Sequence, residues 1–172
     1  MNCGANQKNE IASGIAAEIM GGSIPDFYRL IRAIDDREIY EKVGRISRGI
    51  GMTSDDPVSL FAAGQIYYNL GDEEKALDCM RRAGELGVGS ASYAAAKLLE
   101  EMPDLEQSTE AEILRLKKNA CKNGNLKACW SVLKTQKSGP FSTAKYWVYR
   151  YVYVPIMVVK IKFTDAHSDR IR

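Results

Sequence analysis

The chain has 172 residues, of which 45% are hydrophobic and 27% are charged, and its formal net charge is +2. This composition is typical of one globular domain and excludes a disordered chain. The nearly neutral charge also excludes the overall basic character expected of a nucleic-acid-binding protein. The charge is uneven, because residues 141–172 carry 6 Lys and Arg against 2 Asp and Glu.

The first part of the chain, residues 1–56, is predicted to be helical. Ser23 starts a Ser-Ile-Pro-Asp sequence that suits a helix beginning, and apolar residues follow it at helical spacing. A further helix is predicted over residues 36–47, and Gly49 and Gly51 are expected to end it. We find no repeat here, so the region is predicted to be a helical cap or a degenerate repeat.

The next part, residues 57–138, is predicted to form antiparallel helical hairpins. Asp56 begins a helix with Pro in its first position and Gly71 ends it, while Asp72 begins a partner helix that Gly87 ends. Two helices joined by so short a turn must lie antiparallel. The same signals predict three further helices, over residues 90–101, 113–122 and 126–136.

Small residues recur with identical spacing in two successive hairpins. Ala and Gly are expected where helices touch, because a larger side chain would push the stack apart. The first hairpin has Ala76, Ala83, Gly87 and Ala91 at the spacings of Ile113, Ala120, Gly124 and Ala128 in the second. This internal repetition predicts an all-α stack of α-α hairpins.

The pattern resembles the Sel-1-like repeats, a branch of the tetratricopeptide-like superfamily. The resemblance covers residues 58–137 and also includes Ala63, Gly64, Tyr67, Ala95, Ala96 and Leu99. It implies a short solenoid of helical hairpins. We therefore divide the chain into a helical N-terminal cap (1–56), the repeats (57–138) and an aromatic, basic C-terminal extension (139–172).

The resemblance also implies that the protein binds a partner protein or peptide, as an adaptor or scaffold. In such stacks the first helix of each hairpin lines a concave surface, where aromatic anchors and polar donors hold a peptide. The alternative is that the aromatic residues pack between repeats. The candidate groove consists of Phe61, Gln65, Tyr68, Asn69, Tyr93, Lys97, Trp130 and Lys134.

Two cysteines, Cys121 and Cys129, lie eight residues apart. The spacing resembles that of disulfide-rich bacterial members of the family, in which such a pair bridges consecutive helices. The alternative is that both are small, buried, reduced side chains at helix contacts. A metal site is not expected, because there is no Cys-x2-Cys motif and His167 is the only histidine.

No catalytic motif or cofactor-binding motif is recognisable, so an enzyme is not expected. A single histidine argues against Ser-His-Asp or Cys-His catalysis. Arg45 and Arg48 lie among glycines, but the Gly-Lys-Ser/Thr of a phosphate loop is missing. The alternative function is a binder or hydrolase of small-molecule or peptidoglycan-type ligands in the cell envelope, as suggested for cysteine-rich members of the family.

The C-terminal extension contains the apolar, aromatic segment 146–159, which is followed by Lys160 and Lys162. It is too short and too charged to span a bilayer, and its β-branched and aromatic residues predict an irregular or β-prone tail. Residues 146–162 have three alternative roles: docking on the protein's own body, contact with a partner, or contact with a membrane surface.

The first 22 residues lack the basic start and continuous apolar stretch of a secretory signal. The sequence as given therefore favours the cytoplasm. The alternative location is the periplasm or cell envelope, which would require an upstream leader.

Overall fold

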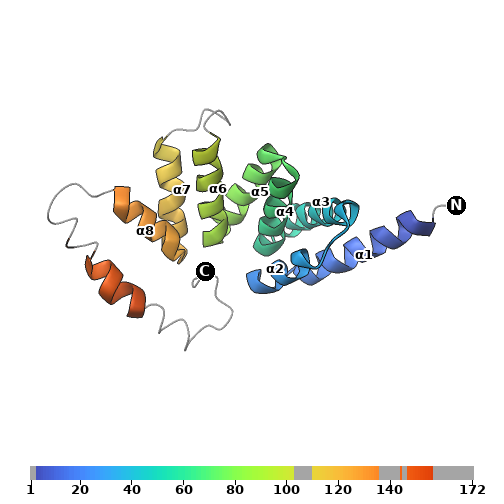
Figure 1. The fold of residues 1–172 in the computed structure, drawn as a ribbon, viewed down its shortest axis with the longest axis horizontal. Coiled ribbons are helices and arrows are strands. Elements are labelled where there is room, and N and C mark those ends of the chain that lie inside the picture. Colours follow the sequence, from blue (N-terminus) through green and yellow to red (C-terminus); the bar gives the residue numbers. More distant parts are fainter. Residues whose placement is uncertain (1–2, 103–109, 136–143, 145–146, 157–172) are drawn as a thin grey trace.

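Every element in the part of the chain that the structure describes is a helix (Figure 1). The computed structural model describes residues 3–102, 110–135, 144 and 147–156. Its α-helices are α1 (Cys3–Ile19), α2 (Ile24–Arg32), α3 (Arg37–Ser54), α4 (Pro57–Leu70), α5 (Glu73–Glu85), α6 (Gly89–Glu101), α7 (Glu110–Lys122) and α8 (Leu126–Thr135). The prediction of an all-α fold is confirmed for these residues.

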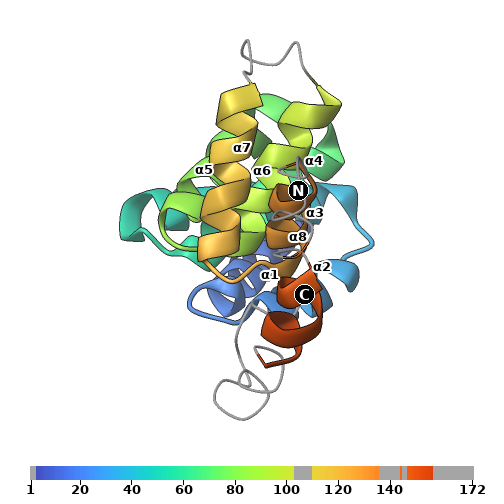
Figure 2. The same cartoon turned by 90° about the vertical axis from the view of Figure 1, so that its left-hand side faces the viewer.

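Helices that follow one another from α3 to α8 pack against their neighbours in chain order. The first helix, α1, lies along α3 and so covers the N-terminal end of the stack (Figures 1 and 2). Lys8 of α1 contacts Asp36 at 2.8 Å and Glu38 at 2.6 Å. This ion-pair cluster ties α1 to the start of α3.

The turns between helices use the residues that the sequence predicts. Asp56 and Asp72 each accept a hydrogen bond from the backbone N–H three residues later, at 2.7 and 3.2 Å. Gly71, Gly87 and Gly124 follow α4, α5 and α7 with φ of 81°, 99° and 87°. Only glycine adopts this conformation without strain. The helix ends predicted at these three glycines are confirmed.

The predicted break at Gly49 and Gly51 is wrong, because α3 continues through both residues to Ser54. A Cβ atom on Gly51 would lie 2.5 Å from Cγ of Leu60, so this glycine lets α4 approach α3 closely. Gly49 has open space beside it. The helix ends instead at Asp55, whose φ of 53° is left-handed, immediately before the next N-cap.

The described core residues include two apolar clusters. One joins α1, α2, α3 and α4 around Phe27, Val43 and Leu60, and the other joins α4 to α7 around Leu77 and Leu99. The alanines of the predicted repeat are fully buried at the helix contacts, with 0% exposure at Ala76, Ala83, Ala91, Ala120 and Ala128. Tight helix packing at these positions is what the recurring small residues predict.

The prediction of an irregular or β-prone tail is wrong for residues 147–156, which are helical. We call them the C-terminal helix; its middle turn is the π-helix η2 (Tyr149–Tyr153). Aromatic residues four apart stack on each other here, Trp147 on Tyr151 and Tyr149 on Tyr153, at 5.2 and 4.8 Å between ring centres. A helix satisfies its backbone groups locally, and these ring pairs add to it. Residues 157–172 lie outside the described residues.

Candidate partner-binding surface

Helix α8 carries Trp130 and Lys134, and its first turn is fixed to the end of α7. Cys121 and Cys129 are joined by a disulfide, with their Cα atoms 4.5 Å apart. Asn125 caps the start of α8 by accepting a hydrogen bond from the Ala128 N–H at 3.0 Å. Trp130 directly follows the bridged Cys129, so the bridge also fixes the backbone that carries the indole.

A cavity of about 660 Å³ lies between α6, α8 and the C-terminal helix. Its aromatic walls come from Tyr93 and Trp130, both of which are half-buried. The guanidinium of Arg150 lies 5.2 Å from the centre of the Trp130 ring, a cation–π contact that seats the C-terminal helix against α8. The lining residues are Tyr93, Leu126, Lys127, Trp130, Ser131, Lys134, Arg150 and Val154.

This cavity is electropositive. It is lined by Lys127, Lys134 and Arg150, and no acidic side chain is among its described lining residues. None of these three cations forms an ion pair within the part of the chain that the structure describes. The sequence explains this, because residues 113–164 contain 11 Lys and Arg and no Asp or Glu.

A second cavity, of about 630 Å³, adjoins the first. It is lined by Pro25, Tyr28, Arg29 and Arg32 of α2 together with Lys127 of α8, which the two cavities share. Figure 2 places α2 and α8 on the same side of the stack, with α5 on the other. We call the two cavities together the basic groove; it combines aromatic rings with cations from helices far apart in sequence.

The structure brings together three of the eight predicted groove residues, Tyr93, Trp130 and Lys134. The other polar members lie outside the basic groove, and two of them, Tyr68 and Asn69, contact neighbouring helices. The Tyr68 hydroxyl donates to Glu101 at 3.4 Å, and Asn69 donates to the hydroxyl of Tyr40 at 2.7 Å. Lys97 pairs with Glu100 at 2.9 Å, and Gln65 is half-buried outside the basic groove.

The eighth predicted residue, Phe61, does not line a groove. Its side chain is 1% exposed, because α2 covers this part of α4. Its ring meets those of Phe27 and Tyr28 edge-on, at 6.0 and 6.3 Å between centres. Phe61 is therefore a core residue, and its ring packs against the Tyr28 ring that lines the basic groove.

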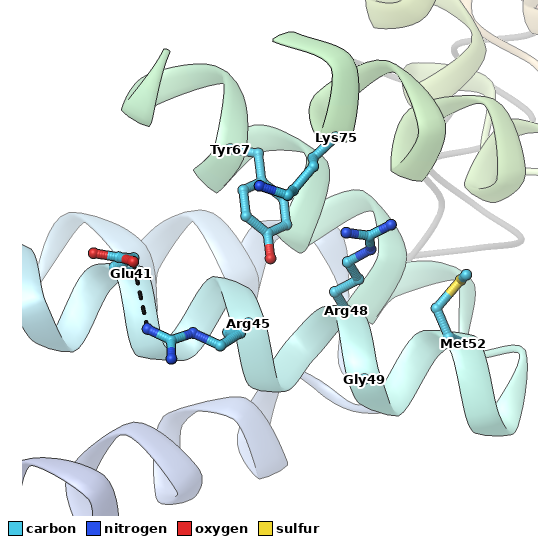
Figure 3. Close-up of a pocket in the computed structure, with 7 residues that line it drawn as sticks. All are labelled: Glu41, Arg45, Arg48, Gly49, Met52, Tyr67 and Lys75. Atoms are coloured by element: carbon cyan, nitrogen blue, oxygen red, sulfur yellow. Dashed lines mark hydrogen bonds and ion pairs between the residues drawn. The ribbon is translucent and has the colours of Figure 1, made fainter. Parts of the chain in front are cut away.

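Another cavity, of about 490 Å³, lies on the α3 and α5 side of the stack (Figure 3). We call it the paired cavity, because its cations have carboxylate partners. The Tyr67 ring is its centre, with the Arg48 guanidinium 5.9 Å and the Lys75 ammonium 5.6 Å from the ring centre. Its lining residues are Glu41, Arg45, Arg48, Gly49, Met52, Tyr67 and Lys75.

Each cation of the paired cavity is balanced locally. Arg45 pairs with Glu41 at 3.4 Å, as the dashed line in Figure 3 marks, and Arg48 pairs with Asp78 at 3.1 Å. Lys75 pairs with Asp72; their hydrogen bond lowers the pKa of the Asp72 carboxyl and raises the pKa of Lys75. Two of the arginines that the sequence places among glycines thus lie on a continuous helix and are already paired.

Sequence reasoning missed the α2 side of the basic groove and the contribution of Arg150. The region before residue 57 has no detectable repeat, so no face of α2 could be assigned to the concave surface. The available signal was the unbroken absence of acidic residues from 113 to 164, which leaves Lys127, Lys134 and Arg150 without an acid close in sequence. Arg115 and Lys117, nearer its start, pair with Glu112 and Glu100, which precede it.

Within the described residues, no group of three or more His, Cys, Asp or Glu side chains is arranged to hold a metal ion. No helix among them is long and apolar enough to cross a lipid bilayer. Comparison of the chain with protein-family models, curated proteins and solved structures gives no match. The Sel-1-like assignment therefore stays a prediction from the sequence.

Proposed function

We propose that the protein is a non-catalytic binding module that holds an acidic, aromatic-containing peptide segment of a partner protein in the basic groove. The observation that carries the proposal is that two cavities share Lys127, which places Lys127, Lys134 and Arg32, all without an ion-pair partner among the described residues, beside half-buried aromatic rings. The all-α stack is the scaffold, and binding is the activity.

Acidic residues in the partner follow from the charges. Lys127, Lys134 and Arg32 have no ion-pair partner among the described residues, so a bound carboxylate would gain a contact without breaking one. Electrostatic complementarity of this kind steers association and fixes the register of the ligand.

Apolar anchors in the partner follow from the rings. Tyr93 and Trp130 present half-buried faces, and Trp and Tyr are the side chains that most often dominate the energy of an interface. A peptide that alternates acidic and aromatic residues would fill the space between these rings and meet the cations at their edge.

The test measures binding of a short fluorescein-labelled peptide of Glu and Tyr residues by fluorescence anisotropy. The expected result is saturable binding that weakens as salt rises, because exposed charge pairs are screened. A matched peptide with Lys in place of Glu should not bind.

The site is tested by the Tyr93→Ala/Trp130→Ala variant, which should weaken peptide binding by about 30-fold or more, as hot-spot truncations do. Circular dichroism should show unchanged helicity. Tyr68→Ala removes a half-exposed ring outside the groove and is the matched control, with unchanged affinity. Equal binding by the double variant would refute the proposal.

One observation favours a second candidate, a cell-envelope binder or hydrolase of small-molecule or peptidoglycan-type ligands. Disulfides such as Cys121–Cys129 are typical of proteins in oxidising compartments. Thiol titration of the native protein, together with a binding assay for a muropeptide, separates the two candidates. Reduced cysteines and no muropeptide binding would remove the second one.

A further inference from the structure

The C-terminal helix turns a broad apolar surface to solvent. Six of its ten residues are large hydrophobic side chains with exposures between 46% and 60%, namely Trp147, Val148, Tyr151, Val152, Tyr153 and Ile156. No other helix that the structure describes exposes so many. Scattered exposed apolar residues are normal, but a contiguous patch marks an interaction surface.

Among the described residues, the contacts between this helix and the rest of the protein involve a few of its side chains. Arg150 lies over the Trp130 ring, Val154 lines the basic groove, and Tyr149 is half-buried. Burial raises the pKa of the Tyr149 hydroxyl to about 12. Arg150 therefore joins the helix to α8, while the six apolar residues keep about half of their surface exposed.

The charged residues nearest to this helix in the sequence are all positive. Lys145 precedes the helix, Arg150 lies within it, and Lys160 and Lys162 follow it, whereas the first acidic residue after Glu112 is Asp165. An excess of cations beside exposed apolar side chains complements a surface that is negative and has an apolar interior. An anionic lipid bilayer has both properties.

The types and arrangement of the exposed side chains favour a bilayer over a protein groove. Trp and Tyr concentrate at membrane interfaces, where their rings lie at headgroup depth. A helix that binds in a protein groove presents a narrow stripe of apolar side chains at positions i, i+3, i+4 and i+7. The exposed apolar side chains of the C-terminal helix cover a broader part of its surface. The ten described residues of the helix are too few to cross a bilayer, and a helix with exposed apolar and aromatic residues beside cations can lie in its surface.

We propose that the C-terminal helix docks the protein on anionic membrane surfaces, with Val148, Val152 and Ile156 among the acyl chains and the aromatic rings at headgroup depth. The basic groove then lies beside the membrane, open to a partner. This inference stands on the helix alone and does not require the peptide-binding function.

The first experiment is flotation of the full chain with vesicles of phosphatidylcholine and phosphatidylserine, and with phosphatidylcholine vesicles. The expected result is binding to the anionic vesicles that decreases with salt. Val148→Asp/Val152→Asp should reduce the bound fraction by about tenfold or more, because two apolar contacts become two charges of the wrong sign.

The matched control is Met20→Asp/Leu86→Asp, which places the same charges at two exposed apolar residues outside the C-terminal helix. This variant should float like the unmodified protein. Equal flotation of both variants would overturn the proposal, as would equal binding to both kinds of vesicle.

The second experiment uses the two tryptophans, Trp130 and Trp147. In Trp130→Phe the remaining Trp147 should shift its emission to the blue on binding and be quenched by brominated lipid. In Trp147→Phe the remaining Trp130, held under Arg150, should be quenched much less. No quenching of Trp147 contradicts the proposal. A concentration-dependent dimer that Val148→Asp/Val152→Asp abolishes, without any lipid binding, would assign the surface to a second copy of the chain instead.

Discussion

The basic groove and the paired cavity each offer three or more cations and at least one aromatic ring, yet they differ in what surrounds the cations. In the paired cavity Arg45, Arg48 and Lys75 each contact a carboxylate of the same protein. In the basic groove Lys127 and Lys134 have no such partner within the described residues. A cation that is already paired has little to gain from a ligand, so counting charges does not locate a binding site.

The origin of the difference lies in the sequence. The helices that form the paired cavity carry acids within three or four residues of their cations, as Glu41 does for Arg45 and Asp72 for Lys75. Such pairs form along one helix or across its cap. From residue 113 onward acids are missing for 52 residues, so the cations of α8 and the C-terminal helix have nothing nearby to pair with.

Reversing the charge of two lysines in the basic groove should change peptide affinity far more than reversing a charge in the paired cavity. Lys127→Glu/Lys134→Glu should weaken binding of the Glu-Tyr peptide by about 100-fold, since two favourable contacts become repulsive. Arg45→Glu, in the paired cavity, should change the affinity less than about twofold. Anisotropy titrations at one salt concentration measure both. Equal losses in the two variants would mean that the peptide senses only net charge.

Removing the disulfide should destabilise the protein where α8, which lines the basic groove, is joined to α7. Cys121→Ser/Cys129→Ser is expected to lower the free energy of unfolding by about 2–3 kcal/mol, because the bridge restricts the unfolded chain. Urea denaturation measures this difference. A reductant should produce the same change in the unmodified protein and none in the variant. A variant as stable as the parent would show that the bridge does not form in the protein.

Two glycines of α3 should have opposite effects on stability when each is replaced by alanine. Gly49 lines the paired cavity, and Gly51 packs against α4. Gly51→Ala should destabilise the protein by about 1–3 kcal/mol through its collision with Leu60. Gly49→Ala, with open space beside it, should stabilise it by about 0.5–1 kcal/mol. Thermal denaturation followed by circular dichroism distinguishes the two signs, and neither variant should alter peptide affinity. Stabilisation by both would contradict the close approach of α3 and α4.

An effect confined to alkaline pH concerns Cys79 of α5, which is buried behind the paired cavity. Burial raises the pKa of its thiol from 9.0 to about 11. The unfolded chain loses this proton near pH 9 and the folded protein near pH 11, so the free energy of unfolding should fall as pH rises through this range. The fall should be smaller in Cys79→Ala. An identical pH profile in the variant would show that the thiol is not desolvated.

Helix boundaries that depend on local chemistry were predictable from the sequence, and the groove was predictable only in part. Asp56, Asp72 and Gly71 specify their turns through hydrogen bonds and a φ value that any fold would have to satisfy locally. Gly51 carries the same local signal as Gly71, but its role depends on Leu60 of the next helix, which no local pattern reveals.

The same limit applies to the site. Repeat phase relates Trp130 to Tyr93, and both line one cavity, whereas Phe61 shares that phase and is covered by α2. The aromatic run after residue 146 has the alternation of a strand, yet ring stacking four residues apart stabilises a helix. The case of Phe61 is decided by a contact with α2, which is distant in sequence, and a single sequence does not display such contacts.

The most direct test of the central claim is an amide NMR titration of the protein with the Glu-Tyr peptide. We predict that the largest chemical-shift changes fall on α2, α6 and α8, including Arg32, Tyr93 and the indole N–H of Trp130. Changes centred instead on Arg45, Tyr67 and Lys75 would contradict the assignment of the basic groove as the binding surface.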